Sequence, residues 1–233
     1  MLTLGDNVYS DGAPEEFAKC YDPTWGRFKD RTYPAQGNHD YNTKGAAGYY
    51  AYFGAAAGDA GEGYYSFDLG AWHLIALNSN CSAIGGCEAG SPQATWLRDD
   101  LAAHPNRCVL AYWHHPLFNS GLHGHDNRTQ AFWQALYDYD ADLILTGHDH
   151  NYQRFAPLDP NGSLDPARGI RQFVAGVGGA SHYQFPAIDG NIEASESNTF
   201  GVLQLSLYSD RYDWQFIPEA GGTFTDSGSN RCH

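Results

Sequence analysis

The sequence predicts an α/β fold in which two packed mixed β-sheets are flanked by helices. Short apolar runs alternate with amphipathic segments over the first two-thirds of the chain, and strand-like runs dominate the last third. Such alternation is typical of layered α/β folds. The chain has 233 residues, of which 42% are hydrophobic, and this is enough for one large core. Neither a linker nor a repeat divides it, so we expect one domain over residues 1–233.

The expected strands are apolar runs bounded by Gly, Asp, Asn or His, a pattern typical of buried strands. They are Met1 to Leu4, Tyr33 to Gln36, Tyr64 to Leu69, Trp72 to Leu77, Cys108 to Trp113, Leu143 to Leu145 and Gln172 to Ala175. Further along, Gly201 to Leu207 and Tyr212 to Ile217 alternate apolar and polar residues. Alternation predicts strands with one buried face, and we expect these two to form a hairpin across Ser209-Asp210.

Two helices are predicted from a capping residue followed by an apolar stripe. Ser91 is a favourable N-cap, and Pro92 suits the first helical position. The stripe that follows is Ala94, Leu97 and Leu101. Asn127 is the expected cap of the second helix. Its stripe is Phe132, Ala135, Leu136 and Tyr139.

The charge balance excludes some classes of partner. The chain has 13 Lys+Arg against 27 Asp+Glu, a formal charge of −14, whereas binding to nucleic acid needs a Lys/Arg-rich face. We therefore expect no nucleic acid partner. No apolar run approaches the roughly 18–20 residues of a membrane span, so we expect no membrane partner. The N-terminal residues lack the basic region and the long apolar stretch of a signal peptide.

Five cysteines indicate an oxidising compartment. Cys81 and Cys87 bracket a short loop with two consecutive glycines, which predicts a disulfide, with a zinc site as the alternative. Cys108 and Cys232 are the expected second pair, which leaves Cys20 unpaired. Disulfides favour an extracytoplasmic or secreted origin, although this chain carries no signal peptide.

Polar side chains follow four of the expected strands directly. The segments are Gly5-Asp6-Asn7-Val8-Tyr9, Gly37-Asn38-His39-Asp40, His114-His115-Pro116 and Gly147-His148-Asp149-His150. Ligands in α/β proteins bind at the carboxyl ends of strands. In an extended segment His148 and His150 lie on the same side, because strand side chains repeat every two residues. These imidazoles predict a site for one metal ion or two.

Taken in order, these four motifs resemble the calcineurin-like metallophosphoesterases, and Tyr9 makes the purple acid phosphatase branch the nearest match. The resemblance covers residues 1 to about 155 and implies the four-layer sandwich of that family. It implies that Asp6 bridges two metal ions, with Tyr9 and His150 at the first, which is ferric iron in the purple branch. The second ion is divalent. Its implied ligands are Asn38, His114 and His148.

One departure from the family pattern affects the first metal. Members open with a strand ending in Asp-x-Gly or Asp-x-His, whose Asp binds that ion, and this chain begins within the following strand. We expect Zn, Fe or Mn ions: two if Asp11, Asp149 or water replaces the missing ligand, and one otherwise. The apolar edge at Leu2 to Leu4 should then be covered by a rearranged N-terminus or by a second copy, so we expect a homo-oligomer formed through this edge.

The resemblance also implies roles around the metals. His39 lies near the leaving group with Asp40 orienting its ring, and Asn38 and His39 contact substrate. His123 is the expected catalytic contact to phosphate, and His125 is a further substrate-binding candidate. Arg154 fits either a phosphate contact or an ion pair. The His-x-Pro pattern of the family makes His114 the ligand and His115 its structural partner, with the reverse assignment as the alternative. We expect packing roles for the remaining histidines, His73, His104, His182 and His233.

The implied activity is metal-dependent hydrolysis of phosphate esters, as a phosphomonoesterase or a phosphodiesterase, by attack of a metal-bound hydroxide. Small phosphate esters are the expected substrates. The main alternative is a catalytically weak or inactive remnant of the fold that binds one metal ion. A third possibility is an interaction module that keeps the scaffold.

Overall fold

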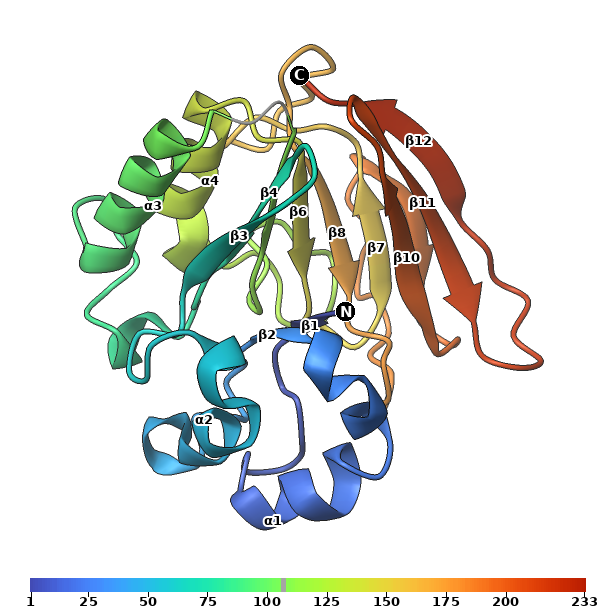
Figure 1. Ribbon diagram of the computed structural model, residues 1–233. Helices are drawn as coiled ribbons and strands as arrows, with labels where there is room; N and C mark the ends of the chain where they lie inside the picture. The colour runs from blue at the N-terminus through green and yellow to red at the C-terminus, as the bar shows by residue number, and fades with distance from the viewer. Residues whose placement is uncertain (106–107) are drawn as a thin grey trace.

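A computed structural model describes residues 1–105 and 108–233 (Figure 1). Its largest sheet is mixed, with the strand order β3-β4-β5-β6-β8-β7-β9. Strands β4, β5, β6 and β8 run parallel, while antiparallel pairs add β3 at one edge and β7 and β9 at the other. The bounds are β3 Tyr65–Leu69, β4 Trp72–Ala76, β5 Cys108–Tyr112, β6 Leu143–Thr146, β7 Tyr152–Phe155, β8 Arg171–Ala175 and β9 Ile192–Glu196.

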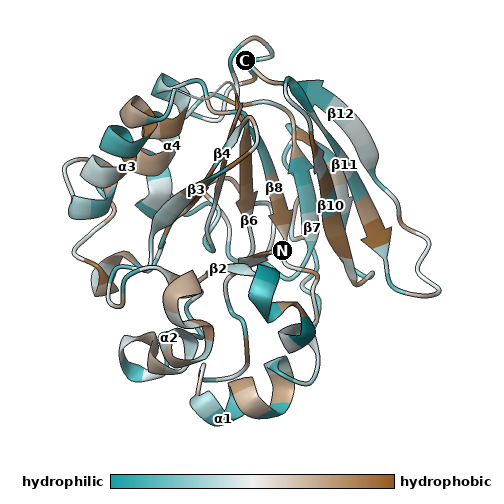
Figure 2. Cartoon of the chain, viewed as in Figure 1, coloured by the Kyte–Doolittle hydropathy of each residue, from teal (hydrophilic) through white to brown (hydrophobic). Residues whose placement is uncertain are grey.

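The second sheet layer consists of two pieces. Strands β10 (Gly201–Leu207), β11 (Arg211–Pro218) and β12 (Ser227–Arg231) form an antiparallel sheet. Strands β1 (Leu2–Leu4) and β2 (Tyr33–Ala35) form a parallel pair. Apolar side chains of both layers share one core, and Figure 2 shows hydrophobic residues gathered on strands such as β6, β8 and β10. The expected α/β sandwich of two sheets is thus confirmed.

Helices α3 (Pro92–Ala103) and α4 (Gln130–Asp138) cover the other face of the large sheet. A second helical group packs through its own aromatic core near the carboxyl ends of the parallel strands. It contains α1 (Pro14–Glu16), η1 (Phe17–Tyr21), η2 (Trp25–Arg31), η3 (Lys44–Ala46), α2 (Ala47–Phe53) and η4 (Gly54–Ala57). Two short 3₁₀ helices complete the set, η5 (Cys81–Ala83) and η6 (Asn127–Thr129). None of the helices in the described part of the chain is long and apolar enough to cross a membrane.

The local predictions succeed where a capping residue or an apolar pattern is clear. Ser91 caps α3 by accepting the Ala94 N–H, and β10 pairs with β11 as a hairpin. The predicted cap at Asn127 is wrong. Asp126 caps this segment instead, accepting the Arg128 N–H, and a 3₁₀ turn precedes α4. Aspartate at the preceding position satisfies the same free N–H groups equally well, so the sequence allows either start.

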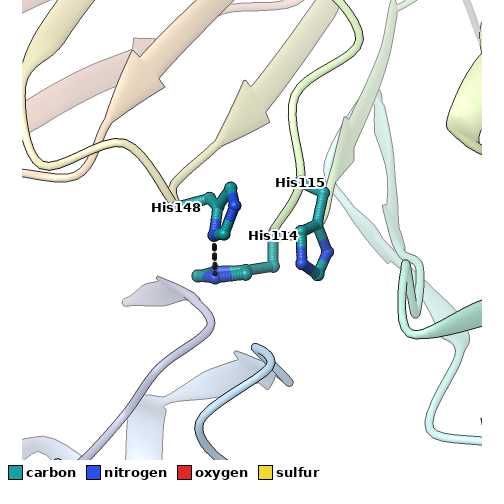
Figure 3. A group of neighbouring side chains, drawn as sticks. All are labelled: His114, His115 and His148. Carbon is teal, nitrogen blue, oxygen red and sulfur yellow. Dashed lines mark hydrogen bonds between the residues drawn. The ribbon is translucent and has the colours of Figure 1, made fainter. Parts of the chain in front are cut away.

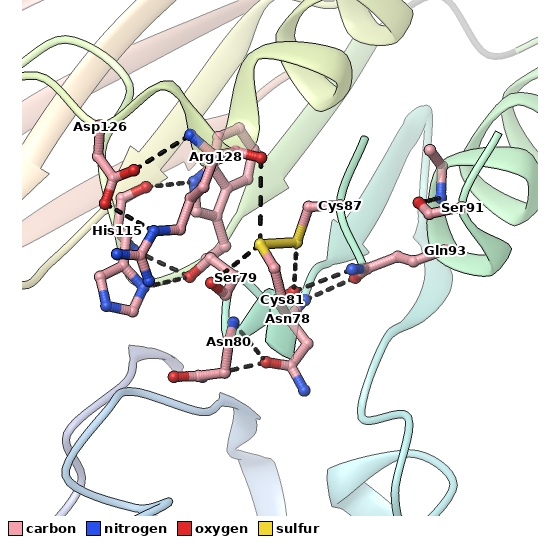
Figure 4. The surroundings of a disulfide bond; sticks show 12 residues. Asn78, Ser79, Asn80, Cys81, Cys87, Ser91, Gln93, His115, Asp126 and Arg128 are labelled. Atoms are coloured by element: carbon pink, nitrogen blue, oxygen red, sulfur yellow. Dashed lines mark hydrogen bonds and ion pairs between the residues drawn. A yellow bond between two sulfur atoms is a disulfide. The ribbon is translucent and has the colours of Figure 1, made fainter. Parts of the chain in front are cut away.

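Both expected disulfides are present. Cys81 pairs with Cys87 in the loop beside η5 (Figure 4), and Cys108 at the start of β5 pairs with Cys232 near the C-terminus. Cys20 is free and exposed. The zinc alternative for Cys81 and Cys87 is therefore set aside, because both sulfurs are already bonded.

The expected apolar edge is visible at β1. Among the described strands β1 pairs with β2 alone, and its other side borders a groove of about 730 Å³ between β1 and β10. Leu2 and Leu4 line one wall of the groove, and Leu203 and Leu205 line the opposite wall. The groove ends at the polar loops that follow β1 and β6.

Candidate metal centre

The polar motifs lie close together because each of them directly follows the end of a strand. Asp6 follows β1, Asn38 follows β2, His114 follows β5 and His148 follows β6. Because β5 and β6 are parallel neighbours, their carboxyl ends meet at one edge of the sheet. Glycine permits the close approach of the first two loops, since a Cβ at Gly37 would overlap the Asp6 carboxylate.

One imidazole nitrogen is the meeting point of four motifs. His114 Nε2 lies 3.2 Å from Asp6 Oδ2 and 3.1 Å from Asn38 Oδ1. It also lies 3.2 Å from His148 Nδ1, the contact drawn in Figure 3. The other ring nitrogen, Nδ1, is 2.7 Å from the Leu4 carbonyl oxygen, which fixes the proton on Nδ1 and leaves Nε2 as a possible ligand atom. A carboxylate, an amide oxygen and two imidazoles form a donor set that suits Zn, Fe or Mn.

A second half of the cluster shares the Asp6 carboxylate. The Tyr9 hydroxyl lies 3.4 Å from Asp6 Oδ2 and 3.2 Å from His150 Nε2. His150 is held by its other nitrogen, which bonds the Ser181 carbonyl at 2.7 Å, and by Tyr183, whose ring stacks at 4.1 Å. All six residues expected to ligate metals therefore lie in one connected cluster, with Asp6 between its two halves.

In the half of the cluster around His114, burial and close neighbours shift the pKa values of the side chains. Burial raises the pKa of Asp6, but the charge of His114 and hydrogen bonds from His114 and His39 outweigh it, so the net pKa lies below its usual range. Burial lowers the pKa of His114, whereas Asp6 raises it, and the net shift is upward. Burial and the neighbouring His114 lower the pKa of His148 to about 3. His148 is therefore neutral at pH 7, the form that binds metals.

The Tyr9 and His150 side chains of the second half are shifted toward their neutral forms in the absence of metal. Burial, followed by the negative charge of Asp6, raises the pKa of Tyr9 above its usual range. Burial lowers the pKa of His150, and the smaller effects of its hydrogen bond to Ser181 and of Asp6 do not reverse the shift. A cation at this position would favour the phenolate, because opposite charges nearby stabilise an ionised group.

His115 lies beside this centre and faces another partner. Its Nδ1 is 2.8 Å from Ser79 Oγ, and its backbone N–H donates to the same oxygen at 3.0 Å (Figure 4). Its ring lies 4.4 Å from that of His148, and the three histidines His114, His115 and His148 form a group close enough to hold a metal ion. The hydrogen bonds to Ser79 support a structural role for His115.

His39 approaches the centre, but Asp40 does not orient it. His39 Nδ1 is 2.6 Å from the Ser10 carbonyl oxygen, and its ring lies 4.7 Å from that of Tyr9. The fully buried Asp40 instead accepts the N–H of Gly37 at 2.9 Å and the Asn7 amide at 3.1 Å. The expected contact between Asp40 and His39 is therefore wrong, because the Asp40 carboxylate bonds the polar groups of Gly37 and Asn7 and not the His39 ring.

The loop after Phe118 brings one of its two histidines to the cluster. The His123 ring lies 4.2 Å from that of His148, and its Nδ1 is 3.4 Å from Asp149 Oδ1. His125 Nδ1 accepts the Asn119 N–H at 3.0 Å, and its ring lies edge-on to Phe118. Within the described chain His125 thus packs on its own loop, whereas His123 faces the centre.

The two carboxylates considered as a further ligand for the first metal ion, Asp149 and Asp11, are placed elsewhere. The Asp149 carboxylate is completely buried and accepts the N–H groups of Leu122 and His123 at 2.9 and 3.2 Å. Turning it toward Tyr9 would break both bonds. Asp11 lies on the exposed loop, where its backbone N–H donates to Glu16.

Arg154 forms ion pairs with Asp226 and Glu193, and this fits the ion-pair alternative for this residue.

Sequence reasoning missed Ser181 and Tyr183, which hold His150. They belong to the segment between β8 and β9, which has no motif of its own. The only sequence signal there is the run Gly176-Val177-Gly178-Gly179, which indicates a turn after β8 and does not indicate where the chain returns. Ser79 was also missed, since a serine in a loop carries no signal for a histidine 36 residues away.

The fold and these side chains together define a metallophosphoesterase scaffold. The family model for calcineurin-like phosphoesterase matches residues 1–152, so the chain belongs to the calcineurin-like phosphoesterase family. Its similarity to curated purple acid phosphatases and acid phosphatases supports the purple acid phosphatase-like branch.

Purple acid phosphatase 15 of Arabidopsis thaliana is 29% identical over 203 residues, covering 76% of this chain and 37% of that protein. Acid phosphatase of Aspergillus ficuum is 25% identical over 234 residues, covering 75% of this chain and 38% of that protein. The chain therefore spans less than two-fifths of the length of these relatives.

Solved structures show the same fold. Purple acid phosphatase PPD1 from yellow lupin (Lupinus luteus) seeds aligns with a TM-score of 0.75 at 17% identity, covering 98% of this chain and 53% of that chain. GAP50, described as the anchor in the inner membrane complex of Plasmodium, aligns with a TM-score of 0.74 at 14% identity, covering 100% of this chain and 78% of that chain. At these identities the likeness concerns the fold alone.

Proposed function

We propose that this chain hydrolyses small phosphate esters, as a phosphomonoesterase or a phosphodiesterase, with metal ions held around Asp6. The observation that carries the proposal is the convergence of Asp6, Asn38 and His148 on His114 Nε2, each within 3.2 Å. Membership of the calcineurin-like phosphoesterase family supports it. Asp6, Asn38, His114 and His148 would hold one ion, and Asp6, Tyr9 and His150 would hold a second.

The residues around the ions supply the remaining chemistry. Bound Zn, Fe or Mn ions supply Lewis acidity and a water of lowered pKa. The Ser10 carbonyl holds the proton of His39 on Nδ1, so His39 Nε2 is left to exchange a proton with the leaving-group oxygen. The half-exposed His123, held by Asp149, contacts a phosphate oxygen beside His148.

The second candidate is a centre that holds one metal ion and has weak activity or none. The geometry of Asp149 favours it, because this buried carboxylate already accepts the N–H groups of Leu122 and His123 from the loop after Phe118. Within the described residues, the half formed by Tyr9 and His150 then has the shared Asp6 as its carboxylate ligand. Metal content separates the two candidates, since hydrolysis by a paired centre needs about two ions per chain.

The test combines metal analysis with hydrolysis of nitrophenyl phosphate and bis(nitrophenyl) phosphate. We expect about two ions per chain at the candidate metal centre, and we expect Asn38→Ala to lose about one of them and at least about 100-fold in kcat/KM, as removal of a group at the reacting centre does. Asn161→Ala, at an exposed loop position, is the control and should keep both. One ion without turnover in the unaltered chain would support the second candidate, and no bound ion would refute both.

We also propose that a second copy of the chain covers the free edge of β1. The groove between β1 and β10 presents the leucines of both walls beside a strand that is paired on one side, and apolar strand edges favour addition of a further strand. Sedimentation velocity at micromolar concentration should show a dimer or larger species. Val202→Lys, at an exposed position of β10 on the groove wall, should shift it toward monomer. A monomeric unaltered chain would contradict this proposal.

The two disulfides support a further proposal, that the chain functions in an extracytoplasmic or secreted setting, where such bonds persist.

A further inference from the structure

A second cluster of metal-binding side chains lies away from the candidate metal centre. It joins β3, β4 and the last turn of α3, at the end of the large sheet where the β3–β4 turn lies in Figure 1, opposite β1. The imidazoles of His73 and His104 and the carboxylate of Asp100 place their ligand atoms within 4.8 Å of one another. No motif in the sequence marks these residues, and the proposed hydrolysis does not use them.

Asp100 is the centre of this group and is held in place. One of its oxygens, Oδ2, lies 2.8 Å from His73 Nε2. The other, Oδ1, accepts the Ser66 hydroxyl at 2.8 Å and lies 3.3 Å from His104 Nδ1. The Asp100 side chain is 8% exposed and that of His73 is 1% exposed. A metal ion would thus replace hydrogen bonds within the cluster without disturbing the surrounding core.

His73 already has the orientation of a metal-bound histidine. Its Nδ1 lies 2.8 Å from Asp68 Oδ1, so the N–H at this position donates to a carboxylate while Nε2 faces Asp100. A histidine that binds a metal through one nitrogen usually donates its other N–H to such a partner, which fixes the ring and raises its basicity. Asp68 fills this positioning role in the cluster.

We propose that His73, Asp100 and His104 form a second metal site, which binds a divalent transition-metal ion such as Zn²⁺. Ligand atoms in a tetrahedral zinc site lie about 3.4 Å apart, so the 2.8 and 3.3 Å distances from Asp100 to the two imidazoles require small adjustments. The 41% exposed His104 can make them, because its ring is stacked on His73 at 4.5 Å and otherwise faces solvent. Water completes the coordination.

The charges of the cluster match a dication. With both imidazoles neutral, Asp68 and Asp100 carry two negative charges, which one divalent ion balances. His104 is the C-cap of the 12-residue α3, and the carbonyl end of a helix attracts cations. On binding, His73 loses its Nε2 proton to solvent and keeps the Nδ1 proton for Asp68. His104 Nδ1 now lies 2.8 Å from the Asp100 carbonyl, and its proton moves to Nε2.

Zinc binding to the whole chain tests the proposal. After removal of metals with a chelator, equilibrium dialysis at pH 7.5 should give one more zinc per chain for the unaltered protein than for His104→Ala or Asp100→Asn. His104 is accessible, so its substitution should leave the fold and the phosphatase activity intact. His233→Ala, which removes another histidine paired with a carboxylate, is the matched control and should retain every zinc.

Two further readouts separate a metal site from a hydrogen-bonded cluster. Micromolar zinc should raise the thermal midpoint of an Asn38→Ala chain, and the added His104→Ala substitution should make that rise smaller. Asp68→Asn should weaken binding by about 10- to 100-fold, as loss of a partner to a ligating histidine does, without lowering the number of ions bound at saturation. Equal zinc content in the unaltered chain, His104→Ala and Asp100→Asn would overturn the proposal.

Discussion

Asp6 has the most demanding position in the candidate metal centre, because one carboxylate oxygen contacts both halves. Its Oδ2 lies 3.2 Å from His114 Nε2 and 3.4 Å from the Tyr9 hydroxyl, while Oδ1 accepts the His39 N–H at 2.8 Å. The backbone at Asp6 has a φ of 52° and follows Gly5 with a φ of 87°. A non-glycine residue in the left-handed region carries strain of roughly 1 kcal/mol or more and is a feature of functional sites.

Tyr9 reports the identity of the metal. If ferric iron binds beside His150, the phenolate should give a visible charge-transfer band, and Tyr9→Phe should abolish it while leaving the ion held by Asn38 and His148. Absorption spectra of iron-loaded protein, with metal content measured on the same sample, check this. Tyr33→Phe, on the exposed edge of β2, should keep the band. A band that survives in Tyr9→Phe would remove Tyr9 from the ligand set.

His39 is expected to matter most for poor leaving groups. His39→Ala should lower kcat by about 100-fold or more for an alkyl phosphate, within the range of general acid catalysis. The loss should be smaller for nitrophenyl phosphate, whose leaving group needs little protonation. Asn42→Ala is the control, because it removes another side chain bonded to the Ser10 carbonyl. Equal losses for both substrates would indicate that His39 only maintains the loop.

At the scale of elements, two covalent links tie loops to the large sheet. The Cys81–Cys87 bond closes a loop with a sequence separation of 6, whereas Cys108–Cys232 spans 124 residues and fixes the C-terminus to the start of β5. A disulfide restricts the unfolded chain more when its loop is longer. The two links should therefore differ in their contribution to the free energy of unfolding.

Replacing both cysteines of each pair by serine should show this difference. In the chain-entropy view, loss of Cys81–Cys87 costs about 2 kcal/mol and loss of Cys108–Cys232 about 5 kcal/mol. Urea unfolding of the two double variants measures both values. Cys20→Ser serves as the control, because this cysteine is free and exposed. The entropic explanation fails if the shorter loop proves the more stabilising.

The sequence predicts those elements in which the pattern of apolar side chains indicates a buried face. Strand β5 is buried throughout, and its apolar residues predict it. Strand β12, Ser227–Arg231, lies at an exposed edge, and it has no large apolar side chain that would predict a strand. It is a strand because its backbone pairs with β11. The same limit applies in the site. Motifs placed Asp6 and His114 together, whereas Tyr183 reaches His150 through a segment whose path depends on tertiary packing.

Across the whole molecule, buried acidic groups link stability to pH. Asp142 follows α4 and accepts the Val109 N–H of β5 and the His233 N–H of the C-terminus, both at 2.8 Å. Its side chain is 1% exposed. Burial raises the pKa of Asp142 to about 6, and these two hydrogen bonds offset only part of that effect. The folded chain therefore binds a proton at Asp142 more tightly than the unfolded chain does.

The sign of the pH effect follows from this difference. A carboxyl whose pKa is raised on folding contributes stability that is fully present below its ordinary value near 3.8 and is lost as the pH rises through about 6. The loss across this interval amounts to about 3 kcal/mol, at 1.36 kcal/mol per pKa unit.

Asp142→Asn should therefore make the free energy of unfolding fall less steeply between pH 4 and 6. Urea unfolding in chelator, so that metal binding does not contribute, measures the slope. Asp99→Asn, at an exposed position of α3, should keep the original slope, and an unchanged slope in Asp142→Asn would assign the pH dependence to other groups.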